Sequence, residues 1–156
     1  MKKNILFAVL FLLFAAIASA GEEYLADTDF EPPDFRGVKW QERLEAISGM
    51  EELYREDDGS QITCSRKGDD LWLGSVELAS IEYIFLEGKL SAVAVVTKGK
   101  ENQKALLDEA KSMYGKETLE MGDTYMWRFT NVMVMYSEEP DDQSVLYYRY
   151  IGFMNQ

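Results

Sequence analysis

"SIEYIFLEGKLSAVAVVTKG", residues 80–99, is the stretch that decides the fold. It contains two runs rich in β-branched and aromatic residues around Glu87-Gly88-Lys89, a pattern typical of a β-hairpin. In the first run Ile81, Tyr83 and Phe85 share one face, and the other face is apolar too. This predicts a position inside a sheet rather than at its edge. A two-residue and a three-residue turn would set different registers, and the sequence does not choose between them.

The clearest helical pattern lies at residues 102–115, just after this hairpin. Its apolar residues recur at three- and four-residue spacing and therefore form one stripe on a helix. Asn102 is a candidate N-cap, and Gly115 is a candidate stop signal. The stripe consists of Leu106, Leu107, Ala110, Met113 and Tyr114. Such a stripe is expected to pack on a sheet.

A shorter helix is predicted upstream, where Trp40, Leu44 and Ile47 recur at helical spacing before a glycine. Residues 50–57 and 60–67 then flank an acidic turn and resemble the two arms of a hairpin. The first of these arms could instead extend the helix.

A second aromatic hairpin is predicted at residues 124–139, "TYMWRFTNVMVMYSEE". With its turn at Thr130-Asn131, Trp127 would face Val134 on the neighbouring strand. The closing stretch, "SVLYYRYIGFM" at residues 144–154, is apolar on both sides and predicts an inner or closing strand of the sheet.

Together these elements predict an α+β fold. A single domain over residues 37–156 would form a twisted antiparallel sheet of about five to seven strands, with two helices packed on one face. Residues 21–36 hold Pro32-Pro33 among acidic residues and predict an extended leader. Residues 1–20 combine two lysines, an apolar run and Ala18-Ser19-Ala20, the features of a cleavable export signal.

The predicted export and the composition of the chain narrow the classes of function and partner to consider. Removal of 20 residues from 156 would leave 136, the size of one domain. Lys2 and Lys3 would be lost while all 28 Asp and Glu remain, so the net charge would fall from −12 to −14. An acidic surface repels phosphate backbones and anionic lipids, which argues against nucleic-acid and membrane-surface partners. The mature chain is expected to be periplasmic or secreted, without a lipid anchor or a membrane span.

The chain holds one cysteine, Cys64, and no histidine. An intramolecular disulfide is therefore excluded, and Cys64 is expected to be a free thiol, either buried in a strand or exposed and able to bridge two molecules. The lack of histidine excludes histidine-ligated zinc and Ser-His or Cys-His nucleophile pairs. No catalytic residue and no cofactor are implied.

Four stretches carry a resemblance: "FRGVKW" (35–40), "SIEYIFLEGKLSAV" (80–93), "MYG" (113–115) and "TYMW" (124–127). They resemble a family of small exported bacterial proteins of unknown function, which often have glycine where this chain has Gln41. More loosely, the architecture is similar to outer-membrane assembly-factor lipoproteins and to secreted β-lactamase inhibitor proteins. The resemblance implies a compact exported domain, and its motifs are turn and core residues rather than site residues.

Two sets of residues are candidate sites. A surface rich in methionine and tyrosine is typical of adaptable peptide-binding faces, although the leader or a second subunit could cover it. This predicted ligand or partner face consists of Met126, Arg128, Met133, Met135, Tyr148 and Tyr150. Two acidic turns could bind calcium through oxygen ligands, but neither has EF-hand spacing, and charged turns are the ordinary surface solution. The calcium candidates are Asp57, Asp58, Asp141 and Asp142.

The function that follows is a non-enzymatic binding or envelope-interaction module with a protein or peptide partner in the cell envelope. Two alternatives stay open. One is a secreted inhibitor-like domain that blocks another protein with its sheet face, and the other is a histidine-free enzyme that uses carboxylates.

Overall fold

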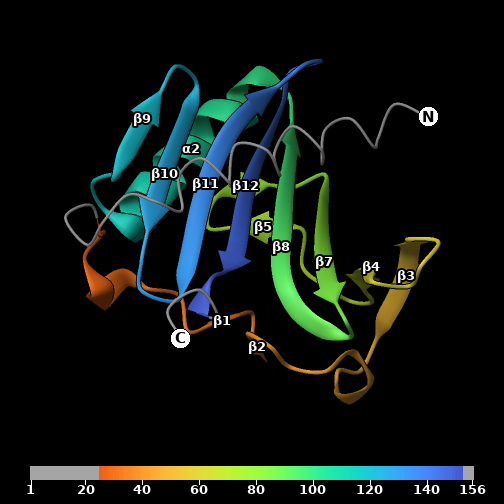
Figure 1. The fold of residues 1–156 in the computed structure, drawn as a ribbon. Coiled ribbons are helices and arrows are strands. Elements are labelled where there is room, and N and C mark those ends of the chain that lie inside the picture. The colour runs from red at the N-terminus through yellow and green to blue at the C-terminus, as the bar shows by residue number, and fades with distance from the viewer. Residues whose placement is uncertain (1–24, 153–156) are drawn as a thin grey trace.

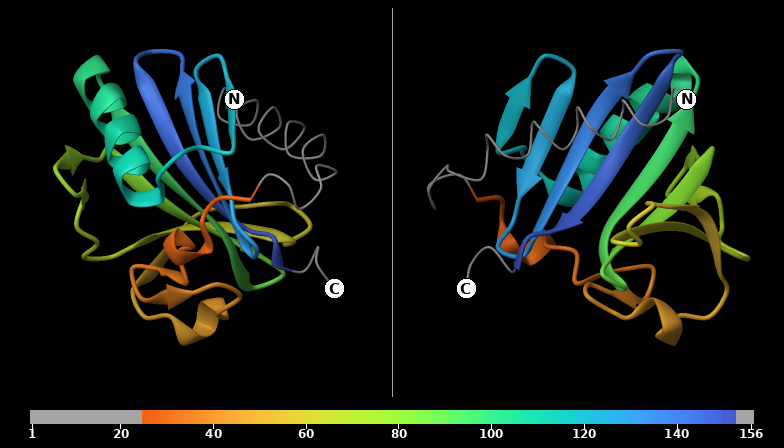
Figure 2. Two further views of the ribbon diagram at one scale, coloured as in Figure 1. Left: turned by 90° about the vertical axis from the view of Figure 1, so that its left-hand side faces the viewer. Right: turned by 45° about the vertical axis from the view of Figure 1, so that its right-hand side comes forward.

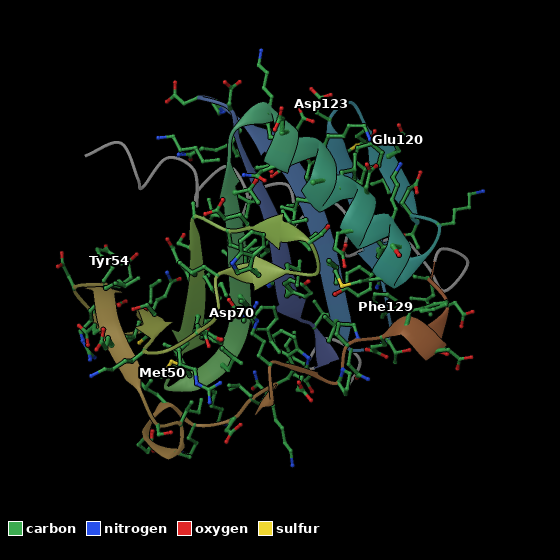
Figure 3. The ribbon with its side chains drawn as sticks, turned by 180° about the vertical axis from the view of Figure 1, so that it is seen from behind. Met50, Tyr54, Asp70, Glu120, Asp123 and Phe129 are labelled. Carbon is green, nitrogen blue, oxygen red and sulfur yellow. The ribbon has the colours of Figure 1, made fainter. Side chains whose placement is uncertain are left out.

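One eight-stranded antiparallel sheet dominates the structure (Figure 1). The computed structural model describes residues 25–152, so the predicted export signal lies outside the described residues. In spatial order the strands are β3, β4, β7, β8, β12, β11, β10 and β9. Their bounds are β3 Met50–Arg55, β4 Gln61–Arg66, β7 Ser80–Leu86, β8 Lys89–Lys98, β9 Leu119–Met121, β10 Thr124–Arg128, β11 Val132–Glu139 and β12 Gln143–Tyr150. Figure 3 shows Tyr54 of β3 and Glu120 of β9 at the two opposite edges.

The predicted α+β class is wrong, because the described chain is mainly β and has a single α-helix, α2 Lys100–Tyr114. The sheet also has one strand more than the upper limit expected. The helix predicted around Leu44 is instead strand β2 (Val38–Lys39) followed by one 3-10 turn, η3 (Leu44–Ala46). The backbone shows why: Gln41 N–H donates to Leu90 O and Leu44 N–H donates to Gly88 O, both at 2.9 Å. These donors pair with the β7–β8 hairpin, so they are not available for a helix.

The β7–β8 hairpin lies inside the sheet, as predicted. Its turn has two residues, Glu87 and Gly88, which both adopt positive φ (49° and 76°) and place Leu86 opposite Lys89. This is the backbone twist that two-residue hairpins favour. The predicted hairpins at 50–67 and 124–139 are confirmed too, and Trp127 does face Val134.

Helix α2 begins earlier than predicted. Its N-cap is Gly99, and the Asn102 side chain instead donates to the carbonyl oxygen of Lys98 at 3.0 Å. The predicted stop is confirmed, because Gly115 follows the helix with a φ of 72°, a conformation that costs glycine little.

Two small sheets lie on the same side of the large sheet as α2 (Figure 2). One pairs β1 (Asp34–Phe35) with β2, and the other pairs β5 (Trp72–Leu73) with β6 (Val76–Glu77). We call this side of the large sheet the near face and the opposite side the far face.

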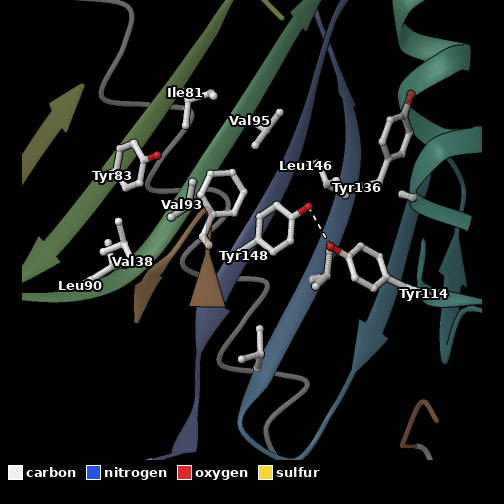
Figure 4. Close-up of a cluster of buried hydrophobic side chains, with 14 of the residues drawn as sticks. Val38, Ile81, Tyr83, Leu90, Val93, Val95, Tyr114, Tyr136, Leu146 and Tyr148 are labelled. Atoms are coloured by element: carbon white, nitrogen blue, oxygen red, sulfur yellow. Dashed lines mark hydrogen bonds between the residues drawn. The ribbon is translucent and has the colours of Figure 1, made fainter. Parts of the chain in front are cut away.

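The near face holds an aromatic core (Figure 4). From α2, Leu106, Ala110 and Tyr114 are buried against the strands. The Tyr114 hydroxyl donates to the Tyr148 hydroxyl at 2.9 Å, and the Trp127 indole donates to the carbonyl oxygen at the helix end. Buried polar groups of the near face are thus satisfied within the chain.

The leader residues from 25 onward run along the near-face core. They include a 3-10 turn, η2 (Thr28–Phe30), and Ala26 N–H donates to Arg128 O at 2.7 Å. Phe35 is buried, with its ring centroid 5.1 Å from that of Tyr148. The leader therefore helps to close the core of the near face.

Candidate functional site

The far face carries a second apolar cluster, and its members among residues 25–152 lie in the large sheet or directly after its strand β12. Its buried members are Ile84, Ala92, Ala94, Met126, Met133, Met135, Val145, Tyr147 and Ile151. Val96 and Leu119 are partly buried and pack against them. In the spatial order of the sheet, the cluster members lie on the strands from β7 through β8, β12, β11 and β10 to β9. Ile151 is the exception and directly follows β12. The cluster is therefore one continuous surface across the sheet.

Strand register aligns the long side chains of this face in a row. Met126 lies opposite Met135, which lies opposite Tyr147, which in turn lies opposite Ala94. Side chains on neighbouring strands in register touch one another, so two methionines, a tyrosine and an alanine form a stripe across four strands.

The next row carries charge. Arg128 lies opposite Met133, and Met133 lies opposite Arg149. Two guanidinium groups therefore flank a methionine at this end of the far face, on a chain whose net charge is −12.

The layer over this cluster differs from that over the near face. Side chains of the far face are buried, with Met135 at 3% and Tyr147 at 7% exposure. Within residues 25–152, α2 and the two small sheets lie on the near face and contribute no side chain to the far-face cluster. None of the described helices and strands is therefore the layer that covers it.

The predicted binding face was only partly correct in its geometry. Met126, Arg128, Met133 and Met135 do share the far face, but Tyr148 and Tyr150 belong to the near face. Tyr148 is 2% exposed and is bonded to Tyr114. The predicted site is thus divided between the two sides of the sheet.

Tyr147 is one of the far-face residues that the sequence prediction missed; the others are Ile84, Ala92, Ala94, Val145 and Ile151. Alternation along the last strand separates Tyr147 from Tyr148, but only the pairing with β11 shows which of them meets the methionines. The length of the β11–β12 turn sets this pairing. Glu139 lies opposite Gln143, so the turn holds three residues and Tyr147 lies opposite Met135.

The electrostatics of two buried tyrosines, Tyr147 and Tyr83, argue against their acting as general bases. Burial raises the pKa of Tyr147 to about 12, and the nearby Arg149 offsets only part of this. Burial also raises the pKa of Tyr83, whose hydroxyl donates to Asp69 at 2.6 Å. Both tyrosines are neutral at physiological pH and cannot act as bases there.

The calcium candidates do not form one site. The β3–β4 turn with Asp57 and Asp58 lies beside the β7–β8 turn, since Glu87 N–H donates to Ser60 O. The β11–β12 turn with Asp141 and Asp142 lies at the other end of the strands, where Gly99 N–H donates to Asp142 O. In the part of the chain that the structure describes, no group of three or more His, Cys, Asp or Glu could hold a metal ion.

Cys64 is a free cysteine in the near-face core. It lies on β4 opposite Tyr83, and it is 2% exposed. Burial raises the pKa of its thiol above the usual value, and the Glu52 carboxylate adds to this effect. The thiol is therefore protonated and shielded, which fits the buried alternative.

Comparison with known proteins gives no match: no family model matches the chain, and no curated protein or solved structure does. The resemblance to small exported bacterial proteins stays a prediction. The structure gives the "FRGVKW" residues structural positions: Phe35 is in the core, Arg36 donates to the carbonyl oxygens of Asp70 and Trp72, and Trp40 donates to that of Pro32. Among residues 25–152, no helix has both the length and the apolar character needed to cross a membrane.

Proposed function

We propose that this chain is an exported, non-catalytic binding module of the cell envelope, and that its far face packs on an apolar helix of a partner protein. The observation that carries the proposal is the far-face cluster, whose described members all lie in the large sheet or, in the case of Ile151, directly after β12. No described helix or strand covers this apolar face, and a contiguous apolar face without its own covering layer is the kind of surface that a partner protein buries.

The composition of the face suits an adaptable contact. Met126, Met133 and Met135 are unbranched thioethers, which fit irregular partner surfaces and recur at binding faces. Ala92 and Ala94 place short side chains beside Tyr147, so that a partner backbone can approach the sheet there. Three of the nine buried members of the cluster are methionines, a side chain that a rigid structural core uses sparingly.

Size and charge favour a helix of another protein over a second copy. From β7 to β9 the face spans five inter-strand spacings, about 24 Å, which is the length of a helix of about 16 residues. Two copies of a chain with a predicted mature charge of −14 would repel each other. A partner helix that is not acidic avoids this cost.

The test is site-specific photo-crosslinking in the cells that make the protein. A photoreactive residue replaces Met135 on the far face or, as the matched control, Met121 of β9, which is exposed. We expect the Met135 position to capture a partner whose cross-linked peptide maps to an apolar helix, and we expect Met121 not to do so.

A competition with matched charges decides the result. Met135→Glu should abolish capture from a photoreactive residue at Met133, whereas Met121→Glu should leave it unchanged. The proposal fails if a folded chain captures nothing from the far face, or if both glutamate variants reduce capture equally.

A further inference from the structure

Strand β3 is an open edge of the large sheet. Residues 51–58 are all exposed, a run that covers most of the strand and enters the following turn. Leu53 and Tyr54 are 56% and 43% exposed, and Figure 3 shows Tyr54 pointing away from the sheet. An edge strand offers unpaired backbone groups to any strand that can lie beside it.

The hydrogen-bond pattern identifies the outward-facing backbone groups. Lys67 N–H donates to Gly49 O at 2.8 Å, so these residues form a hydrogen-bonded pair just before β3. Pair types alternate along an antiparallel ladder, so the next pair directs the backbone of Met50 away from β4. The same alternation directs the N–H and C=O of Glu52 outward.

The other end of β3 gives the same result. Glu56 N–H donates to Gln61 O at 2.9 Å, which makes these residues a hydrogen-bonded pair and directs the backbone of Arg55 outward. Between the two ends the register shifts at Leu53, a β-bulge. Outward donors and acceptors are therefore present on both sides of this bulge.

The side chains around this edge are strongly acidic. The carboxylates between residues 50 and 60 are Glu51, Glu52, Glu56, Asp57 and Asp58. The one cation of this stretch, Arg55, is bonded to Glu52 at 2.6 and 3.0 Å. A second copy of β3 would bring carboxylates against carboxylates, so self-pairing is disfavoured while a cationic strand is attracted.

We infer that β3 is a docking edge for an extended, cationic segment of another protein, which adds to the sheet as a further strand beside β3. Backbone hydrogen bonds to Glu52 and Arg55 would fix the strand, as in other cases of β-augmentation. The exposed Leu53 and Tyr54 would contact alternate side chains of the segment. This edge is separate from the far face and does not depend on the function proposed for that face.

The test uses a capped peptide of about eight residues that alternates lysine and threonine, titrated into the ¹⁵N-labelled chain. We expect shift changes concentrated on β3 and the turn after it, with little change on β9 at the opposite edge. Affinity should fall as salt is added, because the attraction is partly between exposed charges.

Two variants of Glu52 separate strand pairing from simple charge attraction. Glu52→Ala and Glu52→Pro both remove the carboxylate, but only proline removes the outward N–H. Proline is tolerated on edge strands at such positions. We expect Glu52→Pro to bind the peptide about tenfold more weakly than Glu52→Ala. Equal affinity of the two folded variants would overturn the inference.

A second matched pair of variants tests the inference if the proline variant does not fold. Glu51→Lys on β3 should weaken peptide binding about fivefold or more, whereas Glu120→Lys, the same charge change on β9, should change it less than about twofold. Equal losses, shift changes spread over the whole acidic surface, or no measurable binding would each overturn the inference.

Discussion

On the near face, α2 places Leu106, Ala110 and Tyr114 over the strands, and tyrosine hydroxyls find partners within the chain. On the far face of the same strands, the apolar neighbours of Met126 and Met135 within residues 25–152 come from the sheet and from Ile151 directly after it. The near face thus combines rigid aromatic rings with fixed hydrogen bonds, whereas the far face combines flexible thioethers with short alanines. One sheet can therefore hold the fold together with one side and keep the other side adaptable.

The largest effect is expected on the near face. Trp127 is fully buried, and its indole donates to Gly115 O. Trp127→Ala should lower the free energy of unfolding by about 3–5 kcal/mol, because it leaves a cavity and an unpaired carbonyl oxygen. Urea titration of the folded variant measures this loss, and a loss below about 1 kcal/mol would show that the near face is not the main core.

The second largest effect is expected at alkaline pH, which should lower the free energy of unfolding through the near-face core. Burial raises the pKa of Tyr114 to about 12, and its bond to Tyr148 offsets only part of this rise. A tyrosine whose folded pKa exceeds its unfolded value of about 10 contributes stability that is complete below pH 10 and is lost as the pH rises toward 12. The loss from Tyr114 alone should be about 2–3 kcal/mol.

Tyr114→Phe provides the control for this titration. The variant should be less stable at neutral pH by about 1–3 kcal/mol, because the buried Tyr148 hydroxyl loses its partner. Its stability should fall less steeply between pH 10 and 12 than that of the original chain. An unchanged alkaline slope would mean that Tyr114 is not the group that titrates.

The smallest effect is expected at the β7–β8 turn, which both faces share. Glu87 adopts a φ of 49°, where asparagine is strained less than glutamate. Glu87→Asn should therefore raise the free energy of unfolding by about 0.5 kcal/mol. A thermal melt measures the gain, and a loss of stability would argue that the Glu87 side chain has a role of its own.

The parts of the fold that rest on local signals were predicted correctly. The β7–β8 hairpin, the stripe on α2 and the pairing of Trp127 with Val134 follow from periodicity and turn residues close in sequence. The helix expected around Leu44 failed for the opposite reason, because its backbone partners Gly88 and Leu90 lie more than 40 residues away. Spacing alone does not report such partners.

The candidate site shows the same difference between local patterns, which the sequence reveals, and pairings between distant segments, which it does not. The methionines of the far face were grouped correctly, since Met126, Met133 and Met135 belong to one hairpin with a predictable turn. Tyr148 was placed on the wrong face, because the register between β11 and β12 depends on a loop whose geometry the sequence did not reveal. The open edge at β3 needed the strand order, which is a property of the whole sheet.

The most direct test compares two neighbouring residues of β11 that point to opposite faces. Val134 belongs to the near-face core and Met135 to the far-face cluster. In purified chain 21–156, the predicted mature form, Val134→Asp should abolish folding or cost more than about 3 kcal/mol, because the charge would be buried beneath α2. Met135→Asp should cost clearly less than Val134→Asp, because no described helix lies over this side of the sheet, and it should abolish capture of the partner. Equal large losses of stability for the two variants would contradict the account, because the far face would then be part of the protein's own core.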